Sequence, residues 1–292
     1  MVSEERWDDS YIWSNCTGLP PPGTNVDNSP GTWCTNYAIC GVSIVSAALA
    51  SWGRPCEQSA LLIAYFVPTG ASFACAGVIH QFYSETDDIT TPFLVLTVAT
   101  GLLLVLGNAA LGLVGAAAGS GGWESGGCWR GIAIVSLALL LLLPILMATL
   151  LACGVDVVLV MTIAGAPLVL TLLFTSFVWC RALWARGRRG WWRLRRRAIG
   201  DAFKAAAPLL MLASLVVQAS LGASCGKGGY DVCWLACALP APAFNHNALF
   251  HVLYAVGVLM LGVGENLAPE PCAPPSRDYL RAQDASGKVE CH

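Results

Sequence analysis

Residues 92–117 read PFLVLTVATGLLLVLGNAALGLVGAA, an apolar stretch that contains no charged side chain. It is longer than the ~20 residues that a helix needs to cross the ~30 Å hydrocarbon core of a bilayer. In lipid a backbone must satisfy its own hydrogen bonds, which an α-helix does within a single segment. This stretch therefore predicts a transmembrane helix.

The rest of the chain has the same character. Of its 292 residues 56% are hydrophobic and only 12% are charged, and the mean hydropathy is +0.62. Soluble domains carry ~25% charged residues. The predicted membrane spans have approximate cores at 35–52, 60–82, 92–117, 131–152, 157–183, 199–221 and 246–264. Pro68, Pro144 and Pro167 fall inside spans, where neighbouring helices tolerate proline and kinks are common.

We therefore predict an all-α fold, a bundle of seven transmembrane helices. Residues 1–34 are expected to form an extracellular or lumenal segment, 35–264 the membrane domain, and 265–292 a disordered cytoplasmic tail. The orientation follows from the loop after the fifth span, because short cytoplasmic loops collect Lys and Arg. That loop contains Arg181, Arg186, Arg188, Arg189, Arg193, Arg195, Arg196 and Arg197.

Other features agree with an N-terminus outside or in a lumen. Asn15-Cys16-Thr17 is a glycosylation sequon in the N-terminal segment and predicts a glycoprotein. The arginine-rich loop is expected to meet anionic lipid headgroups of the bilayer, and no nucleic-acid partner is expected. A multi-pass protein of the endoplasmic reticulum, Golgi or plasma membrane fits this topology.

The thirteen cysteines divide by compartment. Those on the predicted outer side are Cys16, Cys34, Cys225, Cys233 and Cys237, where disulfides can persist although sequence alone does not give their pairing. A bridge between Cys16 and Cys34 is the first expectation. The cysteines within spans are expected to be small packing residues; they are Cys40, Cys75, Cys153 and Cys180.

Histidine is scarce, and three of the four histidines fall near the outer ends of two spans. His80 is at the end of the second span, and His246 and His251 open the seventh. Histidine is the commonest metal ligand, and a zinc hydrolase needs three protein ligands and an open position. His251 shares a helix face with Asn247, whereas His246 is five residues away, an offset of ~140° in a regular helix. The third ligand is therefore either Asn247 or, if the helix starts irregularly, His246.

Two stretches carry a resemblance to a known family. Residues 72–88 read SFACAGVIHQFYSETDD, and residues 244–254 read FNHNALFHVLY. With seven spans and an outside N-terminus, they resemble the alkaline ceramidases and their wider superfamily, which includes the adiponectin-type receptors. In that superfamily one histidine of the second span and two of the seventh bind zinc, assisted by a serine and an aspartate. The serine lies one turn before the first histidine, where this chain has Ala76, and Ser72 is two turns away.

The resemblance implies a zinc-dependent hydrolase of a lipid amide, similar to ceramide. Zn2+ would be held by His80, His251 and either His246 or Asn247. A bound zinc ion lowers the pKa of its water towards ~7, which produces a nucleophile for an amide carbonyl. Asp88 or Asp87 would act as the general base, and Ser72 would stabilise the oxyanion.

Other classes of protein share this topology. A non-catalytic structural subunit of a membrane assembly is the main alternative, because Ala76 and Asn247 replace residues that the family uses. A receptor is a further alternative. A retinal-binding protein is excluded by the absence of a lysine from the last span. A transporter is disfavoured, since few ionisable residues other than the histidines and Asp156 are expected within the spans.

Overall fold

The computed structural model describes residues 30–52, 57–83, 91–120, 157–187, 195–236 and 246–269, together with a few helical residues between 138 and 150. Within these residues the structure is all-helical and contains no strand, as predicted. The helices are α2 (Pro30–Ser51), α3 (Glu57–Phe82), α4 (Thr91–Ser120), α6 (Val157–Gly187), α7 (Arg195–Ala236) and α8 (His246–Leu267).

Five of the described helices are long and apolar enough to cross a membrane. Their apolar stretches are Gly31–Ser51, Gln58–Phe82, Thr91–Ala118, Arg196–Ser220 and Asn247–Leu267, and α6 adds a shorter one, Pro167–Arg181. Large apolar side chains such as Val45, Leu170 and Val216 point away from the bundle and are more than half exposed. A surface of this kind is typical of a multi-pass membrane protein.

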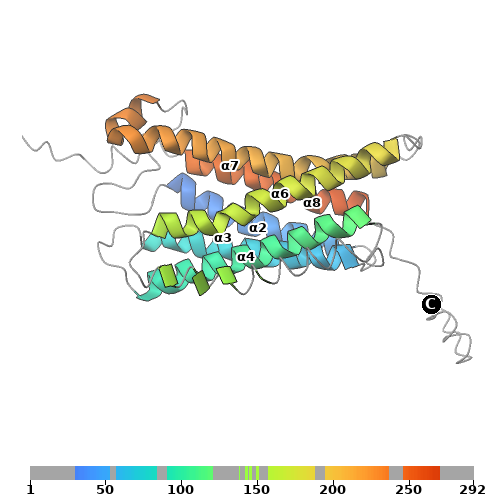
Figure 1. Cartoon of the computed structure of the whole chain (residues 1–292), viewed down its shortest axis with the longest axis horizontal. Helices are drawn as coiled ribbons and strands as arrows, with labels where there is room; N and C mark the ends of the chain where they lie inside the picture. Colours follow the sequence, from blue (N-terminus) through green and yellow to red (C-terminus); the bar gives the residue numbers. More distant parts are fainter. Residues whose placement is uncertain are drawn as a thin grey trace, which may run out of the picture.

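The helices lie side by side along the length of the bundle (Figure 1), and their contacts close a ring. Each packs against the next, in the order α2, α3, α4, α6, α7, α8 and back to α2, while α3 and α8 barely touch. The colours of Figure 1 show that α2, α4, α6 and α8 run in one direction and α3 and α7 in the other. Because α4 and α6 are parallel, the chain between them must return along the length of the bundle.

That return covers the fourth predicted span, residues 131–152, most of which lies outside the described residues; those of its residues that are described are helical. Pro68 and Pro167 are within helices, as predicted, and Pro208 is within α7 as well. Pro144, the sequon at Asn15 and most of the predicted tail lie outside the described residues.

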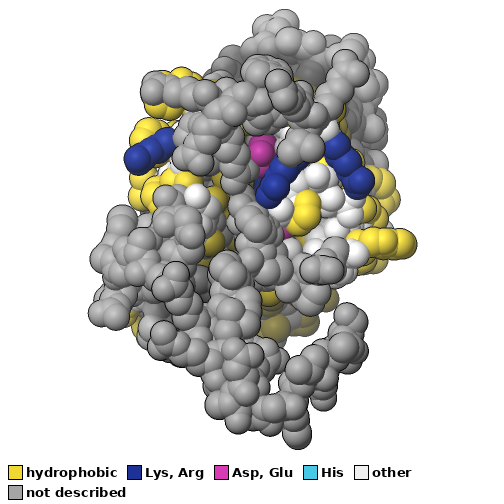
Figure 2. Space-filling view, turned by 90° about the vertical axis from the view of Figure 1, so that its right-hand side faces the viewer, with side chains coloured by type: hydrophobic (Ala, Val, Ile, Leu, Met, Phe, Trp, Pro, Cys, Tyr) yellow, Lys and Arg dark blue, Asp and Glu magenta, His cyan; other side chains and the backbone are white. Residues whose placement is uncertain are grey.

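The two ends of the bundle differ in chemistry. We call the left end in Figure 1 the histidine end, since it contains His251 and the last turn of α3 with His80. The right end is the basic end, where exposed Arg181, Arg196 and Arg197 gather at the junction of α6 and α7. Figure 2 looks onto the basic end and shows Lys and Arg side chains on either side of an acidic one.

Close helix packing depends on glycine at a few positions. A Cβ added to Gly77 of α3 would lie 2.8 Å from the ring of Tyr37 in α2. One added to Gly262 of α8 would lie 2.7 Å from the Cα of Ser46 in α2. Small residues that let helices approach are the usual solution in membranes, where van der Waals packing replaces the hydrophobic driving force. These contacts set the register of α2 against α3 and α8.

Candidate functional site

The inward face of α8 carries several of the polar groups that the structure buries inside the ring. Its residues recur at intervals of three and four, which brings them onto one side of the helix. They are Asn247, His251, Tyr254, Val258, Leu261 and Glu265, all of them buried except the half-buried Asn247. The histidine end of this face is the candidate site.

His251 is enclosed by three helices. It is only 6% exposed, and its Nδ1 lies 3.0 Å from the Thr35 hydroxyl of α2. Its ring centroid is 5.7 Å from that of Phe73 in α3 and 4.9 Å from that of Phe250 in α8. The imidazole is therefore held in one orientation by a hydrogen bond on one edge and by aromatic rings beside it.

The Thr35 hydroxyl also determines which nitrogen of His251 carries the proton. Its oxygen lies 2.6 Å from the carbonyl oxygen of Gly31 and 3.0 Å from that of Thr32. A carbonyl can only accept, and a hydroxyl has one proton, so Thr35 donates that proton to the preceding turn of α2. The hydroxyl must then accept from His251 Nδ1–H. In the neutral imidazole Nε2 consequently holds the lone pair, which is the form that binds a metal or accepts a proton.

His80 lies on the same face of α3 as Phe73 but nearer the end of the bundle. Seven residues separate them, which is two helical turns or ~10 Å along the axis. Because the His251 ring is beside Phe73, the two histidines are stacked along the bundle rather than level with each other. His80 is half-buried.

His246 is the first residue of α8, and its side chain lies outside the described part of the structure. Asn247, the alternative third ligand, accepts a hydrogen bond through its Oδ1 from the Nε2 of Gln218 in α7. That bond joins α7 and α8 at the histidine end. It also occupies the atom through which Asn247 would bind a metal.

The predicted catalytic groups are placed differently. The buried Ser72 donates its hydroxyl proton to the carbonyl oxygen of Thr100 in α4, at 2.9 Å. Acting as an oxyanion donor would require this bond to break, because a serine has a single proton to donate. Asp87 and Asp88 lie outside the described residues.

No group of three or more His, Cys, Asp or Glu side chains that could hold a metal occurs among the described residues. Cys34, Cys40, Cys75 and Cys180 are free thiols. Cys16, the expected partner of Cys34, lies outside the described residues, so the bridge between them stays a prediction.

Two polar clusters were not anticipated from the sequence. One turn further along α8 from His251, towards the basic end, the hydroxyls of Tyr254 and Tyr65 are 3.1 Å apart. Tyr65 donates to the sulfur of Met211 at 3.6 Å. At the basic end, Lys204 and Glu265 form a buried ion pair. Tyr254 follows His251 by three residues, so helical periodicity could have indicated that they share a face. Glu265 directly follows the apolar run 246–264, so the sequence predicts it to be in the tail, but it lies in α8.

The two clusters are separated on the inward face of α8 by Val258 and Leu261, both fully buried. A path for protons or ions needs polar groups next to one another. On the inward face of α8, Val258 and Leu261 separate the polar side chains of one cluster from those of the other. No protein-family model, curated protein or solved structure matches the chain.

Proposed function

We propose that this multi-pass membrane protein crosses the bilayer seven times, with its N-terminus outside or in a lumen. The parallel course of α4 and α6 supports a crossing between them, since the connecting chain must return along the bundle. The arginines of the basic end support a cytoplasmic position for that end, because the short cytoplasmic loops of membrane proteins carry an excess of Lys and Arg. The histidine end would then face outwards.

We further propose that the histidine end is a zinc site that hydrolyses a lipid amide, similar to ceramide. The observation that carries this proposal is the Nδ1–H tautomer of His251 set by Thr35. A histidine that binds a metal through one ring nitrogen usually donates the N–H of the other nitrogen to an oxygen. This hydrogen bond orients the ring and raises the basicity of the ligating nitrogen. His251 has that arrangement, with Nε2 as the ligating atom.

His251 would hold the ion together with His246 and His80, both at the same end of the bundle; because His80 lies nearer that end, its side chain would have to extend back towards Phe73 to reach an ion at His251 Nε2. A bound zinc ion would polarise the substrate carbonyl and lower the pKa of water. Asp88 or Asp87 would accept the proton of the attacking water and deliver it to the leaving amine. The acyl chain of the substrate would lie among the apolar helix surfaces, and its polar head would remain at the membrane interface.

Metal analysis tests this proposal directly. The full chain, purified in detergent without chelator, is expected to contain about one zinc per chain by elemental mass spectrometry. The double variant His80→Ala/His251→Ala should contain none, because two of three ligands are removed. Wild-type protein with no more zinc than the double variant would rule out the metal site.

Thr35 provides a second test of the same site. Thr35→Val keeps the shape of the side chain but removes the acceptor for His251 Nδ1–H. Loss of such an orienting partner typically weakens metal binding by about 10- to 100-fold. Thr35→Ser is the matched control, as its hydroxyl can restore the bond. Competition with a fluorescent zinc chelator measures the affinity, and equal values for all three proteins would contradict the orienting role.

A non-catalytic structural subunit is the second candidate. The enclosure of His251 by Phe73 and Phe250, with 6% exposure, also suits a histidine that serves only in packing. Such a subunit need hold no metal. It would keep its thermal stability in the presence of a strong chelator, whereas a zinc protein would lose stability when the ion is removed.

A further inference from the structure

The basic end of the bundle contains buried charges that the candidate site does not use. Lys204 of α7 and Glu265 of α8 each have side chains that are 1% exposed, and the Asp201 side chain is 6% exposed. A charge removed from water is costly unless it is paired and hydrogen-bonded, and within a membrane protein such groups usually have a function.

The charges are bonded across three helices. Lys204 Nζ lies 3.3 Å from Glu265 Oε2 and 3.9 Å from Asp201 Oδ1. The other oxygen of Glu265, Oε1, accepts a hydrogen bond of 2.8 Å from the Ser59 hydroxyl of α3. One carboxylate thus connects α7 with α3, although α3 and α8 have few other contacts.

Glycines make room for the lysine side chain. A Cβ on Gly264 would lie 2.8 Å from Lys204 Cγ, and one on Gly200 would lie 2.8 Å from the carbonyl oxygen of Gly264. With both residues as glycine, α7 and α8 approach closely enough for the Lys204 side chain to extend across the last turn of α8. The backbone is therefore shaped around this ion pair.

Lys204 also holds the chain that leaves the bundle. Its Nζ donates to the carbonyl oxygen of Ala268 at 2.6 Å, and an Nη of Arg197 donates to that of Pro269 at 3.3 Å. Both residues follow the end of α8 at Leu267. Cations at a helix C-terminus satisfy carbonyl groups that have no partner within the helix.

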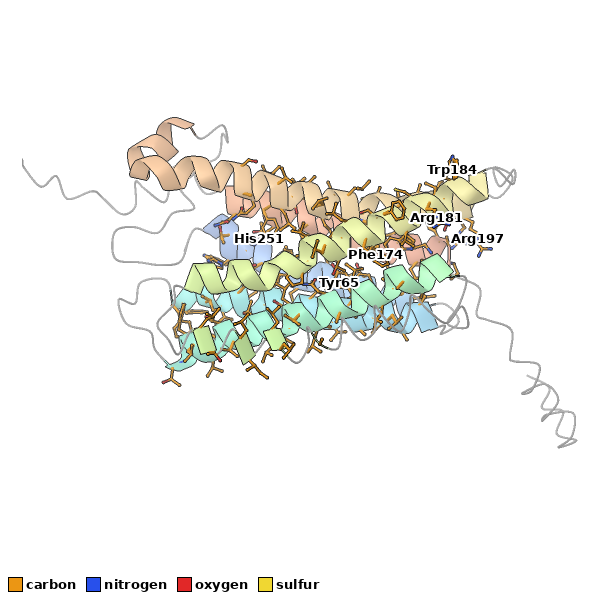
Figure 3. The ribbon with its side chains drawn as sticks, in the orientation of Figure 1. Tyr65, Phe174, Arg181, Trp184, Arg197 and His251 are labelled. Carbon is orange, nitrogen blue, oxygen red and sulfur yellow. The ribbon has the colours of Figure 1, made fainter. Side chains whose placement is uncertain are left out.

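We propose that Lys204, Glu265 and Ser59 form a conformational latch. The latch holds the basic ends of α3, α7 and α8 together and docks residues 268–269, so its release frees the C-terminal segment while the histidine end stays assembled. Figure 3 shows that the two ends are far apart along the bundle, with Tyr65 between them. The proposal does not depend on a metal at His251.

Three variants of the full chain in detergent test the latch. Lys204→Met and Glu265→Gln each leave a buried partner uncompensated, so the Tm is expected to fall by about 10 °C. The double variant Lys204→Met/Glu265→Met replaces both charges with apolar side chains and should recover part of the Tm, although Asp201 still loses the ammonium 3.9 Å away. It still lacks the ammonium that binds Ala268, so hydrogen exchange at residues 266–269 should remain faster than in the wild type by about tenfold.

Ser59→Ala is a milder variant that keeps both charges. It should speed exchange in residues 57–62 and 262–269 and leave residues 30–40 and 247–252 unchanged. Ser51→Ala is the matched control, since Ser51 is exposed and its hydroxyl donates to the Ala48 carbonyl within α2. Single variants with wild-type Tm and exchange would overturn the latch. Faster exchange spread equally over all helices would also overturn it, because release would then not be local.

Discussion

His251→Ala is expected to reduce hydrolysis of a ceramide-like lipid amide to the level of a blank without protein. The variant removes the proposed zinc ligand, whose Nε2 lone pair follows from the hydrogen bond between Nδ1 and Thr35. Loss of one electrostatic group from a hydrolytic site already lowers kcat by about 10²- to 10³-fold, and loss of a metal ligand should cost at least as much. Release of fatty acid from a fluorescent substrate in detergent micelles measures this effect.

His292→Ala is the matched control for that experiment. It also removes one of the four histidines, but from the last position of the chain. Its activity and zinc content should equal those of the wild type. A His251→Ala protein that keeps its zinc and its activity would exclude His251 from the site and favour the packing role that its aromatic neighbours also suit.

Gly262→Leu is expected to destabilise the whole bundle. A Cβ at this position would lie 2.7 Å from the Cα and Cβ of Ser46, and the backbone of α2 cannot yield as a flexible side chain could. The clash would also disturb the hydrogen bond from Ser46 to the Val258 carbonyl of α8. Forced overpacking costs about 1–3 kcal/mol, and more against backbone, so the Tm should fall by roughly 10 °C.

Gly41→Leu is the control for this second prediction. Gly41 is also within a helix, but a Cβ there meets nothing within 4 Å. The substitution should leave the Tm within about 2 °C of the wild type, since leucine favours helix and would face lipid. If both variants melt at the same temperature as the wild type, close packing of α2 against α8 is not needed for stability.

The positions of the helices were predicted correctly where the sequence contains a long, strongly apolar stretch. The stretch 92–117 lies within α4, and the spans predicted around His80 and His251 lie within α3 and α8. Boundaries were less accurate. Helix α2 begins at Pro30 rather than near residue 35, and α7 continues to Ala236 rather than ending near 221. Hydropathy indicates where lipid contact begins, whereas a helix can extend beyond the membrane.

The candidate site was predicted only in part. The scarcity of histidine predicts a site that includes His80 and His251, and both lie towards one end of the bundle. The hydrogen-bond partner of His251 was not predicted, because Thr35 is 216 residues away in sequence. Glu265 was assigned to the tail, because a charge after an apolar run resembles the end of a span. Its partner Lys204, 61 residues away, makes burial of that charge possible.

By itself the sequence determined where the strongly apolar helices lie and that their surfaces are apolar, since these depend on the hydropathy of contiguous stretches. Only the tertiary structure decided the order of the helices in the ring and their register. Those depend on close approaches at Gly77, Gly262 and Gly264, where the partner lies on another helix. Register in turn decides that Thr35 meets His251 and that Lys204 meets Glu265, because a hydrogen bond requires two atoms within about 3 Å.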